Sequence, residues 1–573
     1  MVRIALALTV LAVAATTAAP ASAAPLTFHP PQYIDESYAG GEPVLITDTV
    51  HHRILYSSHE GTTHIYRPGL PALTTFTWAT EYRNQVKIWT SKDGGLTFQR
   101  ASVSATGFGG DPSKNQGFSD PDWAMDASGR VYNTSINLAS QALFSSGDGG
   151  ETFDKGNPEC RPGDRPWLAA AEKDHAFLAT NAIDEGGVLN HRIFETKDGG
   201  TTCSRTGIPN KGAGYAGNGK LLYDHASKQL IEPTQWGSNG LGIATWKEGD
   251  AAFTPHQGVA DTSIYAHWPA IAQDGAGTVY MVWDTNATAD GGDGGCDGAA
   301  TPAPNEILMM YTKDFGKTWS APTAIARGNN TRVFWPWIAA GDAGKLSVVW
   351  YETNKVVDLA CQQADISVKA ATVLDATSDN REIVTADVAG RPIAEGVDIC
   401  QSGTTCVATG EDRRLGDFFT NAIDERGCVI VGTGDVMKPA PGTEQTRHTS
   451  LPLFIRQATG PRIIGSGDCD GSAGSAAKPA APGPVVAQPK PVGAVGKGCG
   501  KVRLAVKAPK GQRLAKVTVT VNGKKTKVSG KGSKRSITVD LRKIKGAKYK
   551  VKVVGLTGQG RRIVSTKTYK KKC

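Results

Sequence analysis

Short apolar runs separated by polar, glycine-rich turns recur along most of the chain. Each unit opens with a polar or aromatic residue, often before a proline, and continues with an apolar strand, a glycine turn and a second strand. Clear examples are residues 267–274 with 278–283 and residues 334–340 with 346–350. No stretch carries a sustained helical period, and apolar runs of this length bounded by glycine are typical of strands. The pattern therefore predicts an all-β protein.

The recurring units follow one another at spacings of about 45 to 80 residues, which is typical of a β-propeller with loop insertions. They begin at Glu42, Asp120, Asp164, Gly219, His267, Phe334 and Leu415. We expect each unit to form a four-stranded sheet, which predicts a seven-bladed propeller over residues 24–470. Six blades are the alternative if the weak unit at Gly219 is not a blade of its own. The last strand, near residues 453–456, is expected to pair with the start of the mature chain and close the ring.

A second phrase, Ser/Thr-x-Asp-x-Gly-x-Thr-aromatic, lies at residues 91–98, 146–153, 196–203 and 312–319, with Cys203 in place of the aromatic residue in the third copy. In a tight turn between strands, the Asp carboxylate can accept backbone N–H groups, the Gly can take a positive φ and the aromatic ring can pack beneath. This phrase resembles the Asp-box, or BNR repeat, of sialidase-type β-propellers. The resemblance implies that these turns are structural and lie on the face opposite the ligand-binding rim.

The two ends of the chain have their own signatures. Residues 1–23 have Arg3, an apolar run from Ile4 to Ala15 and a small-residue cleavage site, which predicts a secretory signal peptide. No later stretch approaches the apolar length of a membrane-spanning helix. Residues 471–498 are rich in Ala, Pro and Gly and are expected to form a linker. Alternating strands with an Asn-Gly turn then predict a small Ig-like β-sandwich at residues 499–573.

Ten cysteines in an exported chain favour disulfides over metal or redox chemistry, and none of the spacings fits zinc. The pairs expected from proximity in sequence and from the ends of the C-terminal module are Cys160–Cys203, Cys296–Cys361, Cys400–Cys406, Cys428–Cys469 and Cys499–Cys573. No cofactor is expected. Calcium is the alternative at residues 284–305, where carboxylates alternate with glycines, but the loop lacks the full order of a helix–loop–helix calcium site.

Charge divides the chain into two parts of opposite sign. Residues 491–573 contain 25 Lys and Arg against one acidic residue, whereas residues 1–490 carry a net charge of −15. Tyr549 and Tyr569 are the only aromatic residues of the basic part, so a base-stacking surface for nucleic acid is not expected. The remaining interpretations are a solvated basic surface and attachment to an anionic polymer or lipid of the cell envelope.

In a propeller, the inner strand of every blade starts at one rim of the central channel, so residues that precede these strands converge. Carboxylates, arginines, a histidine and tryptophans at one mouth suit a sugar, since Arg forks bind anionic groups and Trp faces stack on pyranose rings. The alternative for each residue is structural, namely ion pairs between blades and Trp packing after Pro. The candidate ligand-binding residues are Glu42, Asp120, Asp164, Arg165, His267, Trp268, Trp335, Arg413, Arg414 and Asp417.

The resemblance to sialidases implies three arginines on the substrate carboxylate, a Tyr nucleophile assisted by a Glu, and an Asp acid/base. The matching candidates are Arg165, Arg413 and Arg414 for the arginines, Tyr351 with Glu352 for the nucleophile, and Asp122, or Asp120, for the acid. Neighbouring residues of a regular strand point to opposite faces, which argues against the Tyr351–Glu352 pair. A glycosidase mechanism with two carboxylates is an alternative.

The sequence thus predicts a secreted, monomeric, sialidase-like propeller that recognises an extracellular glycan and, if active, is a glycoside hydrolase of exo-sialidase type. The alternative is a non-catalytic propeller that binds carbohydrate or protein and is attached to the cell envelope by its cationic module. The partners expected are therefore a glycan and an anionic wall polymer, without nucleic acid.

Overall fold

In a computed structural model, the chain divides into two compact units, residues 1–474 and 475–573. The residues that the structure describes are 24–37, 40–60, 66, 85–101, 119–137, 140–183, 189–212, 214–237, 240–260, 264, 268–286, 303–400, 403, 406, 410–438, 449–470, 490–495, 500–506, 514–529, 535–557 and 562–571. The predicted signal peptide, His267 and most of the glycine-rich loop at 284–305 lie outside these ranges. Among the described residues, no helix reaches the length and apolarity needed to cross a membrane.

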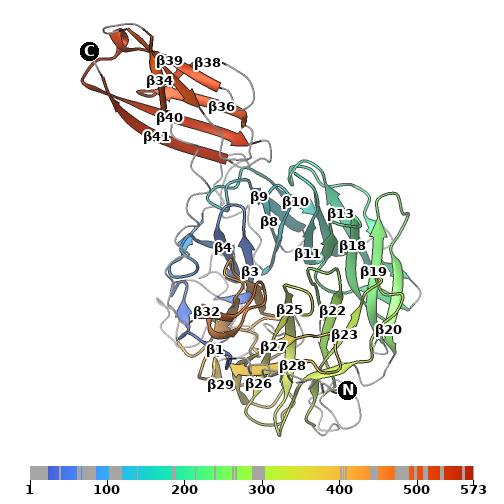
Figure 1. The fold of residues 1–573 in the computed structure, drawn as a ribbon. Helices are drawn as coiled ribbons and strands as arrows, with labels where there is room; N and C mark the ends of the chain where they lie inside the picture. Colours follow the sequence, from blue (N-terminus) through green and yellow to red (C-terminus); the bar gives the residue numbers. More distant parts are fainter. Residues whose placement is uncertain are drawn as a thin grey trace, which may run out of the picture. The chain divides into compact units, whose positions relative to one another are not determined.

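The first unit is built from antiparallel sheets that follow one another along the chain (Figure 1). The first three are β3 (Gly41–Asp48), β4 (Arg53–Glu60), β5 (Gln85–Ser91) and β6 (Gln99–Arg100); β7 (Ser119–Met125), β8 (Val131–Asn137), β9 (Ser140–Ser146) and β10 (Lys155–Arg161); and β11 (Asp164–Ala170), β12 (Ala176–Ile183), β13 (Leu189–Thr196) and β14 (Ile208–Pro209). In each of these sheets, strands that are adjacent in sequence are neighbours in the sheet.

The next three sheets keep the same order, and two of them have additional short strands. They are β15 (Lys211–Gly212), β16 (Tyr215–Gly217), β17 (Leu222–Asp224), β18 (Gln229–Gln235), β19 (Gly240–Lys247) and β20 (Thr254–Ala260); β21 (Ala270–Gln273), β22 (Val279–Asp284), β23 (Glu306–Thr312) and β24 (Thr323–Arg327); and β25 (Val333–Ala340), β26 (Leu346–Thr353), β27 (Ala364–Leu374), β28 (Glu382–Asp387) and β29 (Ala394–Val397). The weak unit at Gly219 therefore lies in a sheet of its own in the described part of the chain.

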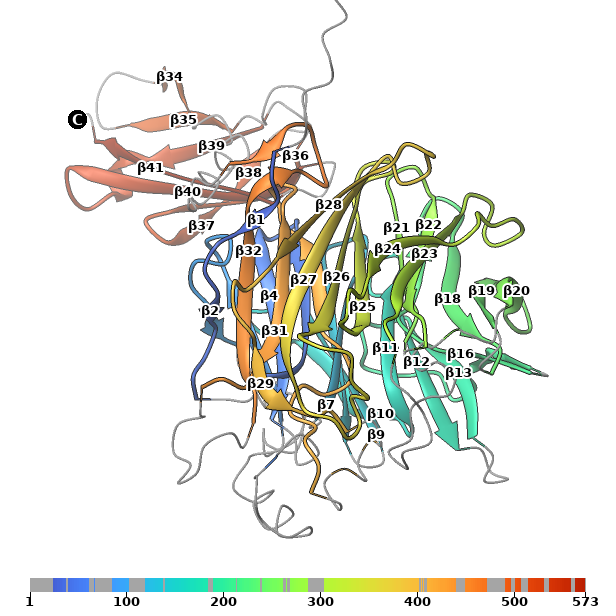
Figure 2. The same ribbon diagram turned by 90° about the horizontal axis from the view of Figure 1, so that it is seen from below.

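The last sheet of this unit closes the ring. It contains β30 (Thr420–Ile423), β31 (Val429–Asp435), β32 (Leu451–Pro461) and β33 (Asp468–Cys469), together with β1 (Thr27–Phe28) and β2 (Gln32–Tyr33) from the start of the described chain. Both N-terminal strands pair with β32, and Figure 2 shows them beside it. The inner strands pack in the cyclic order β3, β7, β11, β17, β21, β25, β30 and back to β3. The predicted all-β propeller is confirmed.

The repeated turns form the hydrogen bonds that their sequence predicts. In the second copy, the Asp148 carboxylate accepts bonds from the backbone N–H and the hydroxyl of Thr152, and the N–H of Gly150 donates to the Ser146 hydroxyl at 2.8 Å. The same bonds recur around Asp93, Asp198 and Asp314. Each turn follows the third strand of its sheet, at the end away from the start of the inner strand.

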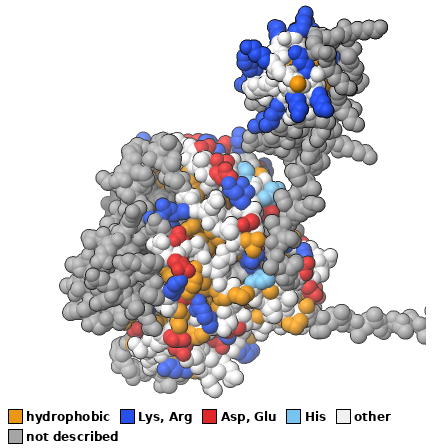
Figure 3. Space-filling model, turned by 90° about the vertical axis from the view of Figure 1, so that its left-hand side faces the viewer, with side chains coloured by type: hydrophobic (Ala, Val, Ile, Leu, Met, Phe, Trp, Pro, Cys, Tyr) orange, Lys and Arg blue, Asp and Glu red, His pale blue; other side chains and the backbone are white. Residues whose placement is uncertain are grey.

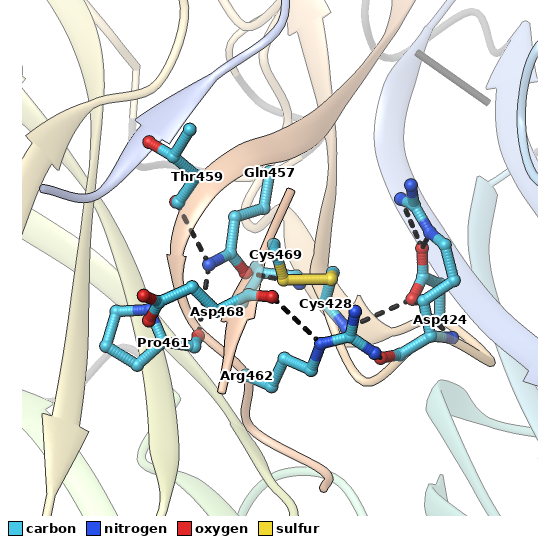
Figure 4. The surroundings of a disulfide bond; sticks show 10 residues. Asp424, Cys428, Gln457, Thr459, Pro461, Arg462, Asp468 and Cys469 are labelled. Carbon is cyan, nitrogen blue, oxygen red and sulfur yellow. Dashed lines mark hydrogen bonds and ion pairs between the residues drawn. A yellow bond between two sulfur atoms is a disulfide. The ribbon is translucent and has the colours of Figure 1, made fainter. Parts of the chain in front are cut away.

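Three predicted disulfides are present, Cys160–Cys203, Cys400–Cys406 and Cys428–Cys469. The third joins the start of β31 to β33 (Figure 4). Beside it, the Arg462 side chain donates hydrogen bonds to the carbonyls of Asp468 and Arg426, so the chain leaving β32 is held on both sides of the bridge. Each of the other two predicted pairs includes at least one cysteine outside the described residues.

The second unit is a β-sandwich of two four-stranded sheets. One contains β34 (Lys490–Val495), β35 (Lys501–Val506), β39 (Arg535–Asp540) and β38 (Val528–Ser529), and the other β37 (Lys524–Thr526), β36 (Leu514–Val521), β40 (Lys548–Thr557) and β41 (Arg562–Lys570). Its core includes Leu504, Val519, Ile537 and Val551. Strand β34 comes from the segment whose composition predicts a linker, and it pairs with β35.

Candidate functional site

Four inner strands open with the same backbone feature, a β-bulge whose first residue precedes a proline. Glu42, Asp120, Arg165 and Trp335 each have a positive φ of 47°, 52°, 57° and 50°, respectively, and the strand register shifts at each. A left-handed backbone at a non-glycine residue before proline is disfavoured, at a cost of about 1–3 kcal/mol each. Bulges change the direction of a side chain relative to regular strand alternation. The bulges thus set the direction of predicted rim residues on four of the inner strands.

Glu42 lies at the junction of three sheets and is fully buried. Its two carboxylate oxygens accept hydrogen bonds from the backbone N–H of Asp120 at 3.1 Å and of Asp417 at 3.2 Å. The His59 ring, also buried, lies with Nε2 3.5 Å from the same carboxylate. Burial, followed by the negative charge of Asp417, raises the pKa of Glu42 to about 8. This side chain therefore holds the rim together and is largely protonated at neutral pH.

The carboxyl group of Asp120 is less buried than that of Glu42. Its side chain is half-buried and accepts a hydrogen bond from the Ser119 hydroxyl. Burial, and then the neighbouring carboxylates of Glu42 and Asp164, raise the pKa of Asp120 well above its usual value. A raised carboxyl pKa is a property that enzymes use in a general acid.

The arginines predicted to form one cluster bind carboxylates of their own loop. Both terminal nitrogens of Arg413 donate to the two oxygens of Asp417. Arg414 is buried, donates to Asp412 and lies with its guanidinium 5.1 Å from the centre of the Tyr66 ring. These pairings neutralise both arginines, which differs from the expected cluster of three cations around a substrate carboxylate.

Arg165 is different from the other two arginines. Its guanidinium lies 5.1 Å from the centre of the Trp268 ring, a cation–π distance, and its side chain is half-buried. Among the described residues it makes no ion pair. The preceding residue, Asp164, is exposed and accepts a hydrogen bond from the Arg165 backbone N–H. Arg165 and Asp164 are thus the charged groups of the rim that remain most available.

Aromatic rings from four inner-strand segments meet around the channel axis. Trp167 lies 5.8 Å from Trp268, 5.7 Å from Trp337 and 5.2 Å from Phe418, measured between ring centres. Trp167 and Trp337 each lie two residues after a bulge residue, whereas Trp268 and Phe418 each lie two residues before an inner strand. All four rings are buried, with 3–7% of their surface exposed, so the cluster is part of the hydrophobic core at the rim end of the sheets.

The predicted acid Asp122 has a structural environment. It is fully buried, and both of its oxygens accept hydrogen bonds from Lys220 Nζ, at 2.8 and 2.7 Å. The backbone N–H of Leu168 donates to it as well, at 2.7 Å. Asp122 therefore joins three consecutive sheets.

The predicted nucleophile pair is not assembled. Tyr351 is fully buried and stacks on Phe419 with the ring centres 4.0 Å apart. Its hydroxyl forms a hydrogen bond with the Thr433 hydroxyl at 2.8 Å. Burial raises its pKa, which disfavours the phenolate. Glu352 lies on the other face of β26, accepts a hydrogen bond from Thr331 and borders a groove beside β24. The alternation of strand side chains separates the two, so among the described residues Tyr351 and Glu352 do not form the pair that the sialidase mechanism requires.

Two further residues lie in the neighbouring sheets, the predicted ligand-binding residue Trp335 and the carboxyl residue Asp284. Trp335 is buried and packs against Phe334 and Tyr351, which is the core-packing alternative for this residue. Asp284, at the end of β22, is also buried, and burial raises its pKa to about 7 despite the charge of Arg332.

Sequence reasoning did not select Trp167 and Phe418 for the rim. Trp167 lies two residues after the bulge residue Arg165, and Phe418 directly follows the predicted rim residue Asp417, so the signal was an aromatic residue within two positions of a predicted rim residue. Lys220, which pairs with Asp122, was also missed, because the strand pattern around Gly219 is weak. No group of three or more metal-binding side chains is present among the described residues.

No family model matches the chain, and no curated protein matches its sequence. Similar solved structures include YCF48 bound to D1 peptide, with 12% identity, a TM-score of 0.39, and 76% of this chain and 97% of that chain covered. The intramolecular trans-sialidase from Ruminococcus gnavus has 10% identity, a TM-score of 0.37 and coverages of 74% and 96%. The Aleuria aurantia lectin AAL has 10% identity, a TM-score of 0.35 and coverages of 62% and 96%. At these values the likenesses assign no function to this chain.

Proposed function

We propose that the propeller is a secreted protein that binds an extracellular glycan at the rim formed by the bulge residues. The observation that carries the proposal is the group of charged side chains that stay accessible at this rim, Asp120, Asp164 and Arg165, beside the buried aromatic cluster. Ligand sites typically place a few directed polar groups that fix the orientation of the ligand. Sugar hydroxyls both donate and accept hydrogen bonds, so they match carboxyl and guanidinium groups of this kind.

The pairing of the arginines bears on the class of sugar. A sialic acid carboxylate requires cations that are not already neutralised, and Arg413 and Arg414 are bound to Asp417 and Asp412. Arg165 remains as a single cation for an anionic group. These contacts favour a neutral, hydroxylated glycan over a sialoside, and they favour binding over sialidase-type hydrolysis.

Hydrolysis is a second candidate function, favoured by the raised pKa of Asp120. In that case Asp120 would act as general acid, and a second carboxylate of the rim would complete a two-carboxylate mechanism. Asp164 is the available partner, since it is exposed and its negative charge already influences Asp120.

A glycan array probed with the full-length protein, followed by turnover assays on fluorogenic glycosides including a sialoside, tests both functions. Binding without turnover supports the binding protein. Turnover that Asp120→Asn abolishes, while binding changes less than about threefold, supports the hydrolase. Absence of binding to every glycan contradicts the proposal.

A second candidate concerns the C-terminal unit, which we propose attaches the protein to an anionic polymer of the cell envelope. The observation that favours it is the excess of 25 Lys and Arg over a single acidic residue in residues 491–573. Figure 3 shows Lys and Arg side chains spread over the visible part of this unit. Deletion of residues 475–573 is expected to release the protein from the envelope, and retention of the truncated protein would contradict the attachment.

A further inference from the structure

The lysines of β40 all face one side of the second sheet of the C-terminal unit. Lys548, Lys550 and Lys552 are exposed, while Tyr549, Val551 and Val553, which alternate with them, are buried in the core. The strand alternation therefore sorts the charges to the outer face and the apolar residues to the inner face. Successive lysines of this row are about 6.8 Å apart along the strand, because each is two residues from the next.

Neighbouring strands extend this row into a broader surface. Lys570 lies directly opposite Lys548, and Thr568 lies opposite Lys550. On the other side, Thr520 lies opposite Lys552, and Lys525 lies opposite Thr520. We call the seven residues the lysine–threonine face: Lys525, Thr520, Lys548, Lys550, Lys552, Thr568 and Lys570.

No acidic residue lies on this face. Between residues 491 and 573 the only acidic residue is Asp540, which belongs to the other sheet. Its carboxylate accepts two hydrogen bonds from the Arg542 side chain, at 2.9 and 2.7 Å. Within the described residues of this unit, no carboxylate therefore offsets the positive charges of the lysine–threonine face.

The aromatic residues of this unit are turned away from the face. Tyr549 and Tyr569 are buried and stack on each other with their ring centres 5.4 Å apart. They cannot stack on bases of a nucleic acid bound to the opposite side of the sheet, and stacking is the usual contribution of aromatic residues to single-strand binding. The face offers ammonium groups and hydroxyls only.

We infer that the lysine–threonine face binds a linear phosphodiester polymer with a short polyol backbone, lying along β40. This inference rests on the proposed attachment function and names its surface and ligand. Lysine ammoniums act as point charges for single phosphates, and threonine hydroxyls donate hydrogen bonds to phosphate oxygens. In a polymer with one small polyol between successive phosphates, the distance between phosphates is similar to the distance between successive lysines of β40. A bulky sugar between anionic groups would separate the charges further.

The test measures binding of the full-length protein to poly(glycerol phosphate), with polyglutamate and poly(dT) of matched charge as comparison polymers. The test variant is Lys548→Ala/Lys550→Ala/Lys552→Ala. The matched control is Lys501→Ala/Lys543→Ala/Lys545→Ala, which removes the same charge from exposed positions on β35 and after β39. All six lysines are exposed, so both variants are expected to keep the thermal unfolding midpoint of the wild type.

We expect the test variant to bind poly(glycerol phosphate) at least tenfold more weakly than the control variant. The slope of log affinity against log salt should fall by about two to three, since each lost phosphate contact removes close to one unit. Equal losses of affinity for poly(glycerol phosphate) in the two variants would overturn the assignment of the lysine–threonine face as the binding surface. Equal or tighter binding of polyglutamate or poly(dT) by the wild type would overturn the ligand class. Binding of none of the three polymers would overturn the attachment function itself.

Discussion

The backbone N–H of Asp417 donates a hydrogen bond to Glu42 at 3.2 Å across 375 residues of chain. The other oxygen of Glu42 accepts the N–H of Asp120, so one side chain links the first, second and last sheets at the rim. Closure of the propeller thus has two parts. Pairing of β1 and β2 with β32 closes the outer strands, and the Glu42 carboxyl closes the inner ones.

The pKa of Glu42 makes the stability of the propeller depend on pH. In the folded protein this pKa is about 8, whereas the unperturbed value is 4.5, so the folded state binds the proton more tightly between these values. The contribution of Glu42 is therefore complete below about pH 4.5 and is lost as the pH rises through 8. Urea unfolding at pH 5, 7 and 9 should show this loss in the wild type and a flatter dependence in Glu42→Gln. Parallel pH profiles of the two proteins would contradict the assignment.

The ion pair of Asp122 and Lys220 should be stabilising only as a pair. Lys220→Met leaves a buried carboxylate without its cation and is expected to lower the free energy of unfolding by about 3–5 kcal/mol. The double variant Asp122→Asn/Lys220→Met should recover part of this loss, since the buried charge is gone. Chemical denaturation of the wild type, both single variants and the double variant gives the coupling energy. Additive effects would show that the two side chains do not interact.

The repeated turns should affect stability without affecting ligand binding. Asp148→Ala removes the acceptor of the Thr152 hydrogen bonds and is expected to destabilise the propeller by about 1–2 kcal/mol. The turn lies at the end of the sheet away from the rim, so affinity for a glycan should be unchanged. Thermal unfolding and a binding titration on the same sample measure both effects. A weaker affinity in a fully folded variant would place the turn in the site.

The contribution of each disulfide to the free energy of unfolding should depend on the length of chain that it encloses. Cys160–Cys203 encloses 43 positions and joins the second and third sheets, whereas Cys400–Cys406 encloses six. In the chain-entropy account, the longer loop gives the larger stabilisation, about 3–4 kcal/mol, and the shorter loop less. Unfolding of the two double Cys→Ser variants compares them. A larger loss for the Cys400–Cys406 variant would contradict this order.

The fold was predictable because its information is local and repeated. Alternating apolar strands and the Ser/Thr-x-Asp-x-Gly-x-Thr phrase each determine a hairpin, and their recurrence predicts a ring that brings Glu42 near Asp120 and Asp417. Three disulfides followed from proximity along the chain. The strands β1 and β2 were expected at β32 because a ring must close.

The pairing of side chains at the rim was not predictable in the same way. Whether Arg414 faces a ligand or binds Asp412, two residues away, depends on rotamers that no periodicity encodes. The burial of Asp122 depends on Lys220, which comes from a different sheet. Strand alternation did separate Tyr351 from Glu352, which shows that simple geometry outweighed the family resemblance at this position.

The central claim is that the rim binds a glycan, and calorimetric titration of the best glycan from the array tests it most directly. The variants are Arg165→Ala, which removes the guanidinium above Trp268, and Arg205→Ala, which removes an exposed arginine from the loop that follows the repeated turn of the same sheet. The account predicts at least a tenfold loss of affinity for Arg165→Ala and an unchanged affinity for Arg205→Ala. Wild-type affinity in a folded Arg165→Ala protein would contradict it.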